Sequence, residues 1–168
     1  MAKNPTPKPH AGDIEIAVAR LLNHRVYTMV PNVSWGLGLS HECDILCLDS
    51  RNRFTEIEIK ISAADLRRDF DKAHGHNHKY IGRLVYAMPL DLCLSHGHLI
   101  PKQYGIIACD PKYVSGRWFR QCRFRADAVP VPTSVILKFM NLGCMRIWDL
   151  KSTMYRLQRQ KQAHGTSI

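Results

Sequence analysis

The fold is decided by residues 42–61, which read ECDILCLDSRNRFTEIEIKI. Two runs rich in apolar residues flank the central letters DSRNR, and aspartate, serine and asparagine are common turn residues. This pattern predicts a small antiparallel hairpin. We expect a three-residue loop that places Asp49 opposite Arg53, and this choice fixes every other pair along the two strands.

The side chains of this hairpin separate by chemistry, because neighbours on a strand point to opposite faces. The charged face is predicted to hold Glu42, Asp44, Glu56, Glu58 and Lys60. The apolar face is predicted to hold Cys43, Ile45, Cys47, Ile57, Ile59 and Ile61. Asp44 then lies opposite Glu58, and Glu42 lies opposite Lys60 as its expected salt-bridge partner. A slip of one residue would put Asp44 among the isoleucines, so the pattern supports this register.

Two facing carboxylates with a lysine beside them are suited to a divalent cation. A phosphodiester is an anion that resists attack by another anion, and a bound cation with a nearby ammonium overcomes that repulsion. The hairpin therefore indicates a protein that cuts nucleic acid. The simpler interpretation is a solvated face of a half-buried sheet, because acid-x-basic triplets are common on exposed strands.

Composition sets the broad class of the protein. The chain has 168 residues, 45% of them hydrophobic, which suits one domain with its own core. Lys and Arg number 24 against 14 Asp and Glu, a formal charge of +10 that favours a polyanionic partner such as DNA. A basic domain that binds no nucleic acid is the alternative. The six cysteines form no Cys-x-x-Cys pair. With no apolar run of signal or membrane length, these features predict a soluble, cytoplasmic protein of a bacterial cell or phage-infected host.

The chain divides into a tail and one domain. Residues 1–12 are expected to be a flexible, basic, proline-rich tail, and 13–168 a single nuclease-like domain with a C-terminal helical region at 133–163. Asp13 is a plausible N-cap for an amphipathic helix whose apolar stripe runs from Ile14 to Leu22. Glu15 lies at the edge of this stripe, where it is either a solvated residue or one that reaches toward a cleft.

The remaining pattern alternates strands and helices. A strand over 26–30 is expected to end at Pro31, and Ser62 with Asp65 forms a capping-box arrangement before a further helix. The later strands are expected at 84–88, 104–109 and 117–124, and the C-terminal helix is expected to break at Gly143. The order of elements indicates an α/β layered fold.

The chain resembles the PD-(D/E)XK nuclease superfamily over residues 13 to 128. In that superfamily an acid on the second core strand is followed by acid-x-Lys on the third, within an αβββαβ core. Asp44 matches the first acid, although Cys43 stands where the pattern has proline, and Glu58-Ile59-Lys60 match the triplet. Glu15 matches a glutamate that many members carry on the first helix. The run EIEIKIS with Asp65 and Asp69 is similar to small bacterial and phage members, some of them assigned to DNA repair.

This resemblance implies a restriction-endonuclease-like fold with a central mixed sheet flanked by helices. It also implies that Asp44, Glu58 and the backbone carbonyl of Ile59 bind Mg²⁺ or Mn²⁺. Lys60 would orient or deprotonate the attacking water, or stabilise the charge that develops on the phosphate. Glu15 would hold a metal-bound water or a second ion. The expected catalytic residues are Glu15, Asp44, Glu58 and Lys60.

Several other residues have two interpretations each. Glu56 is either an outer-shell acid or, preferably, an exposed strand residue. His74, His76 and His78 fit no standard zinc spacing and indicate a surface loop, which could face DNA. The candidate DNA contacts, which could equally be solvated surface charges, are Arg67, Arg68, Lys72 and Lys79. Aromatic and basic residues alternate from Trp118 to Arg125, which suits stacking on bases or simply a half-buried strand.

These observations predict a Mg²⁺-dependent deoxyribonuclease that hydrolyses phosphodiester bonds as an endonuclease or exonuclease. DNA repair, recombination or phage DNA processing is the expected context. Cutting both strands of a duplex would favour a homodimer. One alternative is a non-catalytic DNA-binding protein that keeps the nuclease fold. Another is a regulatory or scaffold protein whose basic surface meets a protein partner, and such an interaction would be less sensitive to salt.

Overall fold

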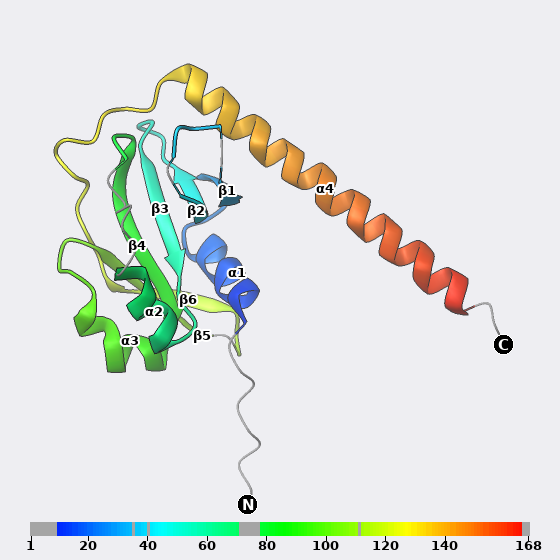
Figure 1. Ribbon diagram of the computed structural model, residues 1–168, viewed down its shortest axis with the longest axis horizontal. Coiled ribbons are helices and arrows are strands. Elements are labelled where there is room, and N and C mark those ends of the chain that lie inside the picture. Colours follow the sequence, from blue (N-terminus) through cyan, green and yellow to red (C-terminus); the bar gives the residue numbers. More distant parts are fainter. Residues whose placement is uncertain (1–9, 35, 40, 71–77, 111, 166–168) are drawn as a thin grey trace, which may run out of the picture.

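A mixed sheet of six strands forms the centre of the molecule, with helices on both faces (Figure 1). The computed structural model describes residues 10–34, 36–39, 41–70, 78–110 and 112–165. The strands are β1 (Thr28–Val33), β2 (Cys43–Leu48), β3 (Phe54–Ile59), β4 (Ile81–Pro89), β5 (Gly105–Asp110) and β6 (Ser115–Arg120). They lie in sequence order, with β3, β4 and β5 parallel and the other neighbours antiparallel. The predicted α/β class with a central mixed sheet is confirmed.

The helices follow the predicted order of one helix, three strands, a helix and a strand. They are α1 (Ala11–Leu21), α2 (Ala63–Phe70), α3 (Leu90–His96), the 3₁₀ turn η1 (Gly97–Leu99) and α4 (Thr133–Gly165). One face of the sheet packs against α1, and the other packs against α2 and α3. Because α2 and α3 connect parallel strands, each crosses the sheet as a βαβ connection.

The hairpin forms in the predicted register. Ile45 pairs with Ile57 and Leu48 with Phe54, which continues the expected pair of Asp49 and Arg53 at the loop. The Asp49 side chain closes this loop by accepting hydrogen bonds from the backbone N–H groups of Arg51 (2.9 Å) and Arg53 (3.0 Å), and its other oxygen accepts from the Arg53 guanidinium. The prediction for α2 is also confirmed at its start, where Ser62 Oγ accepts from the Asp65 N–H at 3.2 Å.

Strand β1 continues past Pro31, where the sequence predicted its end. Pro31 pairs with Ile45 inside the strand. This position tolerates proline because β1 lies at the edge of the sheet, so the missing N–H removes no hydrogen bond to a further strand.

The boundaries of several helices and strands also differ from expectation. The N-cap of α1 is His10 rather than Asp13, and its Nδ1 accepts from the Gly12 N–H at 3.1 Å, so 11–12 belong to the helix and not to a tail. The rest of the predicted tail, residues 1–9, lies outside the described residues. Strand β6 ends at Arg120, and helix α4 runs through Gly143 without a break.

Cys43 lies on the face of β2 opposite to the predicted one. Cys47 packs with the isoleucines beneath α1, as expected, but Cys43 packs with Leu46 and Phe54 on the other side of the sheet. Near this point, Asn32 on the neighbouring strand has a left-handed backbone (φ 52°). The ladder has the pairs Pro31–Ile45 and Val33–Cys43 but no pair at Asn32, and strict alternation along β2 fails at the same place.

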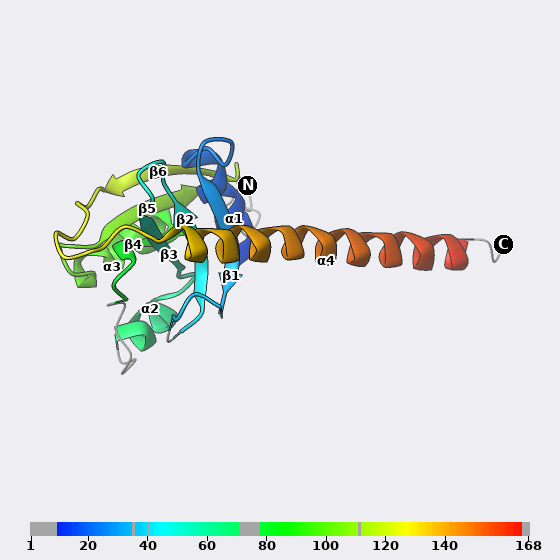
Figure 2. The same ribbon diagram turned by 90° about the horizontal axis from the view of Figure 1, so that it is seen from above.

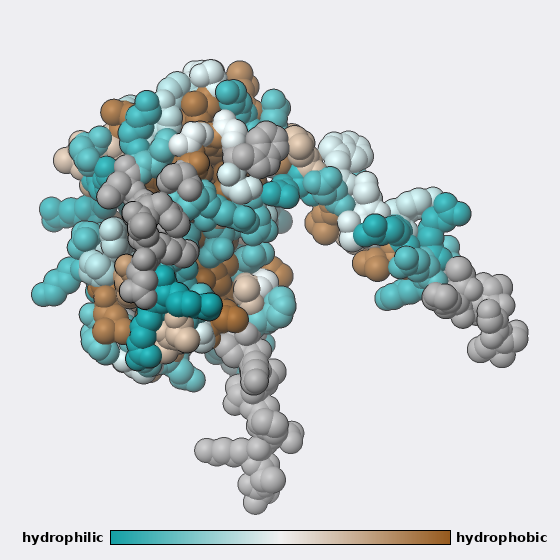
Figure 3. Space-filling view, in the orientation of Figure 1, coloured by the Kyte–Doolittle hydropathy of each residue, from teal (hydrophilic) through white to brown (hydrophobic). Residues whose placement is uncertain are grey.

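Helix α4 is anchored at its start and projects away from the body of the molecule (Figures 1 and 2). The Phe139 ring meets the Phe54 ring edge-on at 5.0 Å between centroids, and Arg146 Nη2 donates to the Asn32 carbonyl at 2.8 Å. Every residue from Ile147 to Gln162 is exposed, and several apolar side chains lie among hydrophilic ones along the projecting part (Figure 3). Within the part of the chain that the structure describes, no helix is both long and apolar enough to cross a membrane.

Candidate active site

Lys60 is the centre of a buried charged cluster that follows the end of β3. Its Nζ donates to Glu58 Oε2 at 2.8 Å and to Asp69 Oδ1 at 2.9 Å. Tyr86 on β4 donates its hydroxyl to the other oxygen of Asp69 at 2.9 Å. Two strands and α2 therefore hold the ammonium in one position. The expected partner Glu42 is exposed and precedes β2, so Lys60 pairs instead with Glu58 and Asp69.

Asp69 has a role in this cluster that the sequence reasoning missed. It is only 5% exposed, although it belongs to a short surface helix that also carries Arg67 and Arg68. The sequence does contain a signal for the burial of Asp69. This residue follows Leu66 by three positions and so shares the buried stripe of the helix. An acid on an apolar stripe requires a partner, which Lys60 and Tyr86 supply.

Asp44 lies where β2 and β3 separate beyond their last regular pair. Its Oδ2 accepts a hydrogen bond from the Ile59 N–H at 2.7 Å, which holds the carboxylate against the end of β3. Burial raises the pKa of Glu15, and the Asp44 carboxylate raises it further. Asp44 also contributes to the raised pKa of Glu58. Asp44 is therefore within electrostatic reach of both acids, one on α1 and one on β3.

The charges of Glu58 and Lys60 are set by burial and by each other. Burial raises the pKa of Glu58 above its usual range, and the Lys60 ammonium offsets only part of this effect. Burial lowers the pKa of Lys60, but the Glu58 and Asp69 carboxylates outweigh it, and the net shift is upward. Lys60 consequently stays protonated at neutral pH.

The acids at this position are candidates to hold a divalent cation. Glu58 is 2% exposed, and its Oε1 has no hydrogen-bond partner among the described residues. A buried carboxylate oxygen left in this way is costly unless a cation takes it. The donors here are oxygens of Asp44 and Glu58, the ligand type that Mg²⁺ prefers over softer metals.

Glu56 is fully buried, which corrects the expectation of an exposed strand residue. Its Oε1 contacts Nε2 of His41, and the Cys43 thiol lies 3.9 Å from the same nitrogen. His41 was not singled out by the sequence reasoning, because no pattern links a histidine before β2 to the centre of β3. Burial, followed by the Glu56 and Glu58 carboxylates, raises the pKa of the Cys43 thiol.

The candidate DNA contacts are surface residues where the structure describes them. Arg67, Arg68 and Lys79 are exposed, and Arg68 lies 3.7 Å from Asp65 in an ion pair within α2. Lys72 lies outside the described residues, as do His74 and His76 of the predicted loop.

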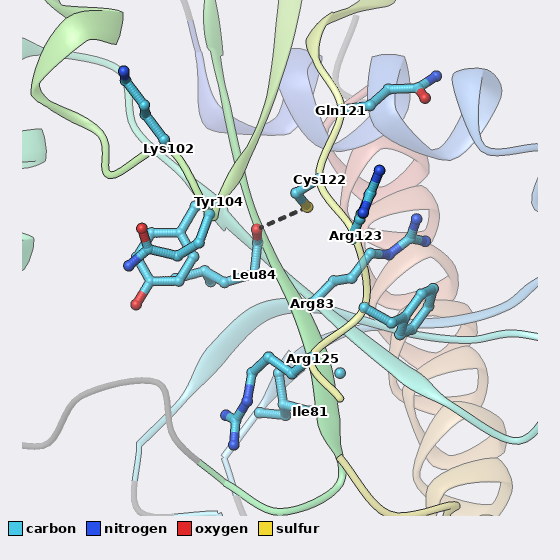
Figure 4. A pocket seen from close by; sticks show the side chains of 12 residues that line it. Ile81, Arg83, Leu84, Lys102, Tyr104, Gln121, Cys122, Arg123 and Arg125 are labelled. Atoms are coloured by element: carbon cyan, nitrogen blue, oxygen red, sulfur yellow. Dashed lines mark hydrogen bonds between the residues drawn. The ribbon is translucent and has the colours of Figure 1, made fainter. Parts of the chain in front are cut away.

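A basic cavity of about 540 Å³ lies near the start of β4, beside the segment that follows β6 (Figure 4). The cationic residues that line it are Arg83, Lys102, Arg123 and Arg125. Arg120, from the same aromatic and basic run, instead donates to the carbonyls of Ile100, Pro101 and Tyr104. Within residues 118–125, Arg120 therefore has a structural role, whereas Arg123 and Arg125 line the cavity.

The fold and the charged cluster together define an α/β protein with a nuclease-like core. A family model described as "DNA repair protein MmcB-like" matches residues 6–154, and the chain belongs to this MmcB-like family. The SPO1766 protein of unknown function from Silicibacter pomeroyi has a similar structure, with a TM-score of 0.61 and 18% sequence identity. The match covers 98% of this chain and 99% of that one, and it supports the fold alone. No curated protein matches the chain.

Proposed function

We propose that this protein is a metal-dependent DNA nuclease of the PD-(D/E)XK type that acts in DNA repair or related DNA processing. The observation that carries the proposal is the buried arrangement in which Lys60 lies against Glu58, with Asp44 held at the same end of β3. Membership of a DNA repair family supports DNA as the substrate.

Asp44, Glu58 and the carbonyl of Ile59 are the residues that would hold Mg²⁺ or Mn²⁺. A divalent ion there supplies Lewis acidity toward a phosphodiester and favours ionisation of a nearby water. The buried Oε1 of Glu58 supports this assignment, since it has no hydrogen-bond partner among the described residues. Glu15 on α1 lies within electrostatic reach of Asp44 and would hold a metal-bound water or a second ion.

Lys60 would act as a fixed positive charge rather than as a base. Its raised pKa keeps the ammonium protonated, and a protonated amine cannot accept a proton from water. Two carboxylates fix its Nζ, so the charge is preorganised toward a phosphate whose negative charge increases during attack. Asp69 and Tyr86 would hold this lysine in place without touching the substrate.

The basic surface offers contacts for the DNA backbone. The chain carries a formal charge of +10, and Arg67 and Arg68 are exposed on α2, the helix that also carries Asp69. Phosphate contacts of this kind weaken steeply as salt concentration rises. DNA affinity is therefore expected to fall with salt, in contrast to a surface that binds only a protein partner.

The test is cleavage of supercoiled, linear, single-stranded and branched DNA with Mg²⁺ or Mn²⁺. We expect cutting by the wild type and a loss of about 100-fold or more in Asp44→Asn and Lys60→Met. Glu42→Gln is the matched control, because Glu42 is an exposed acid two residues before Asp44, and it should cut normally. Calorimetry should show Mg²⁺ binding to the wild type and not to Asp44→Asn.

Two results would overturn the proposal. Cleavage that survives in Asp44→Asn would point to a contaminating nuclease. Salt-sensitive DNA binding without cleavage of any substrate, and without Mg²⁺ binding, would identify a non-catalytic DNA-binding protein with this fold.

A further inference from the structure

A second cluster of metal-binding side chains lies on the same face of β3 as Glu58. It consists of His41 before β2, Cys43 at the start of β2 and Glu56 in the middle of β3. One donor atom from each, a ring nitrogen, a sulfur and a carboxylate oxygen, lie within 4.8 Å of one another. All three side chains are shielded from solvent, including that of His41, which is 6% exposed.

The geometry of the cluster differs from that of a nucleophilic triad. In a Cys–His–acid relay, one ring nitrogen faces the thiol and the other faces the acid. Here Cys43 Sγ and Glu56 Oε1 both approach Nε2 of His41, the thiol at 3.9 Å. Because the thiol and the carboxylate share one ring nitrogen, the three donor atoms are grouped as in a ligand set and not in line as in a relay.

We propose that His41, Cys43 and Glu56 bind Zn²⁺. Zinc accepts nitrogen, sulfur and oxygen donors at about 2.0–2.3 Å, which in a tetrahedron separates neighbouring donors by about 3.3–3.6 Å. The three donor atoms lie within 4.8 Å of one another, near that spacing. Mg²⁺ is a poor fit because it requires oxygen donors, whereas a thiolate and an imidazole suit a softer metal.

This site is distinct from the proposed Mg²⁺ site in both residues and chemistry. Its ligands come from the segment before β2, from β2 and from β3, so a bound zinc would tie the entrance of β2 to the centre of the sheet. Water would complete the tetrahedron.

The test uses the full-length protein, stripped with a chelator and then titrated with Co²⁺ as a spectroscopic substitute for zinc. We expect a thiolate-to-cobalt charge-transfer band with visible bands of tetrahedral cobalt, and displacement of the cobalt by Zn²⁺. Cys43→Ala should abolish the charge-transfer band, and His41→Ala should weaken Zn²⁺ binding by about 100-fold or more. Cys47→Ala is the matched control, because this buried cysteine packs on the opposite face of the same strand and should leave the band intact.

Absence of the band in the wild-type protein would overturn the proposal, whatever the variants do. Persistence of the band in Cys43→Ala would overturn it as well, since another cysteine would then be the ligand. Asp44→Asn should retain the cobalt spectrum while losing Mg²⁺ binding. The zinc site and the nuclease proposal can therefore fail independently of each other.

Discussion

Lys60, directly after β3, donates a 2.9 Å hydrogen bond to Asp69 on α2, and both residues are buried. This bond connects the strand that carries the candidate site to the helix that immediately follows it. The position of the ammonium therefore depends on a residue that is nine positions away in sequence.

Asp69→Asn is predicted to lower the cleavage rate by about 10–100-fold without changing the KM for DNA. An amide still fills the space, but it loses the charge that draws the ammonium into place. Steady-state kinetics with a melting curve checks this result. Asp65→Asn, in the first turn of the same helix, is the control and should cleave normally. An equal loss in both variants would mean that α2 matters only for folding.

Asp49→Ala is predicted to destabilise the protein by about 1–2 kcal/mol at neutral pH, after allowance for solvent screening. Partial burial alone would raise the pKa of Asp49, but hydrogen bonds from Arg53 and Arg51 give a net lowering below 3.8. The stabilisation is thus present above that value and disappears as pH falls through the folded-state pKa.

Urea unfolding of both proteins at neutral pH and at the lowest pH that preserves folding measures this effect. The difference between the Asp49→Ala variant and the wild type should shrink in acid. Asp127→Ala is the comparison, because Asp127 also pairs with an arginine but is exposed, and it should produce no measurable change. A difference that grows in acid would contradict the assigned sign.

Phe139→Ala is predicted to cost about 3–5 kcal/mol of unfolding free energy, because it empties a ring-sized space against Phe54. Leu137→Ala, two residues earlier on α4, should stay within about 0.5 kcal/mol, since Leu137 is exposed. Chemical denaturation measures both. Similar values for the two would show that the start of α4 is not part of the cooperative core.

Arg120→Ala is predicted to destabilise the protein by about 2–3 kcal/mol, because three backbone carbonyls around residues 100–104 lose a charged donor. Arg117→Ala is the control from the same strand, with an exposed side chain that should tolerate removal. Thermal unfolding separates the two. If Arg120→Ala weakens DNA binding but leaves the melting temperature unchanged, this residue contacts DNA instead.

The sequence was sufficient for the local pairing of the hairpin and for the order of the elements. Alternation of charged and apolar residues identifies the register of β2 and β3, because only one register separates the two kinds of side chain. Pro31 and Gly143 depart from expectation for the same reason, because the position of each residue in the fold overrides its intrinsic preference. An edge position removes the cost of the proline, and packing against Val30 retains the glycine inside a helix.

The contacts of the candidate site are harder to predict from the sequence where the two side chains come from distant segments. Glu58 lies on β3 and Lys60 follows that strand directly, so parity places them on one face, whereas the position of Asp69 depends on how α2 packs. His41 and Glu56 meet across the hairpin, but His41 precedes β2 and has no position in the ladder. Cys43 lies on the face where this pair lies, next to the position opposite Asn32 with its left-handed backbone, and alternation alone did not predict that face.

The projection of α4 makes the end of the helix a sensitive reporter of motion at its base. From Ile147 to Gly165 the helix extends about 28 Å at 1.5 Å per residue. At that length, a rotation of about 10° where Arg146 meets β1 would displace the tip by about 5 Å. A spectroscopic label placed near Lys161 would therefore amplify small changes at the edge of the sheet into a readily measured distance.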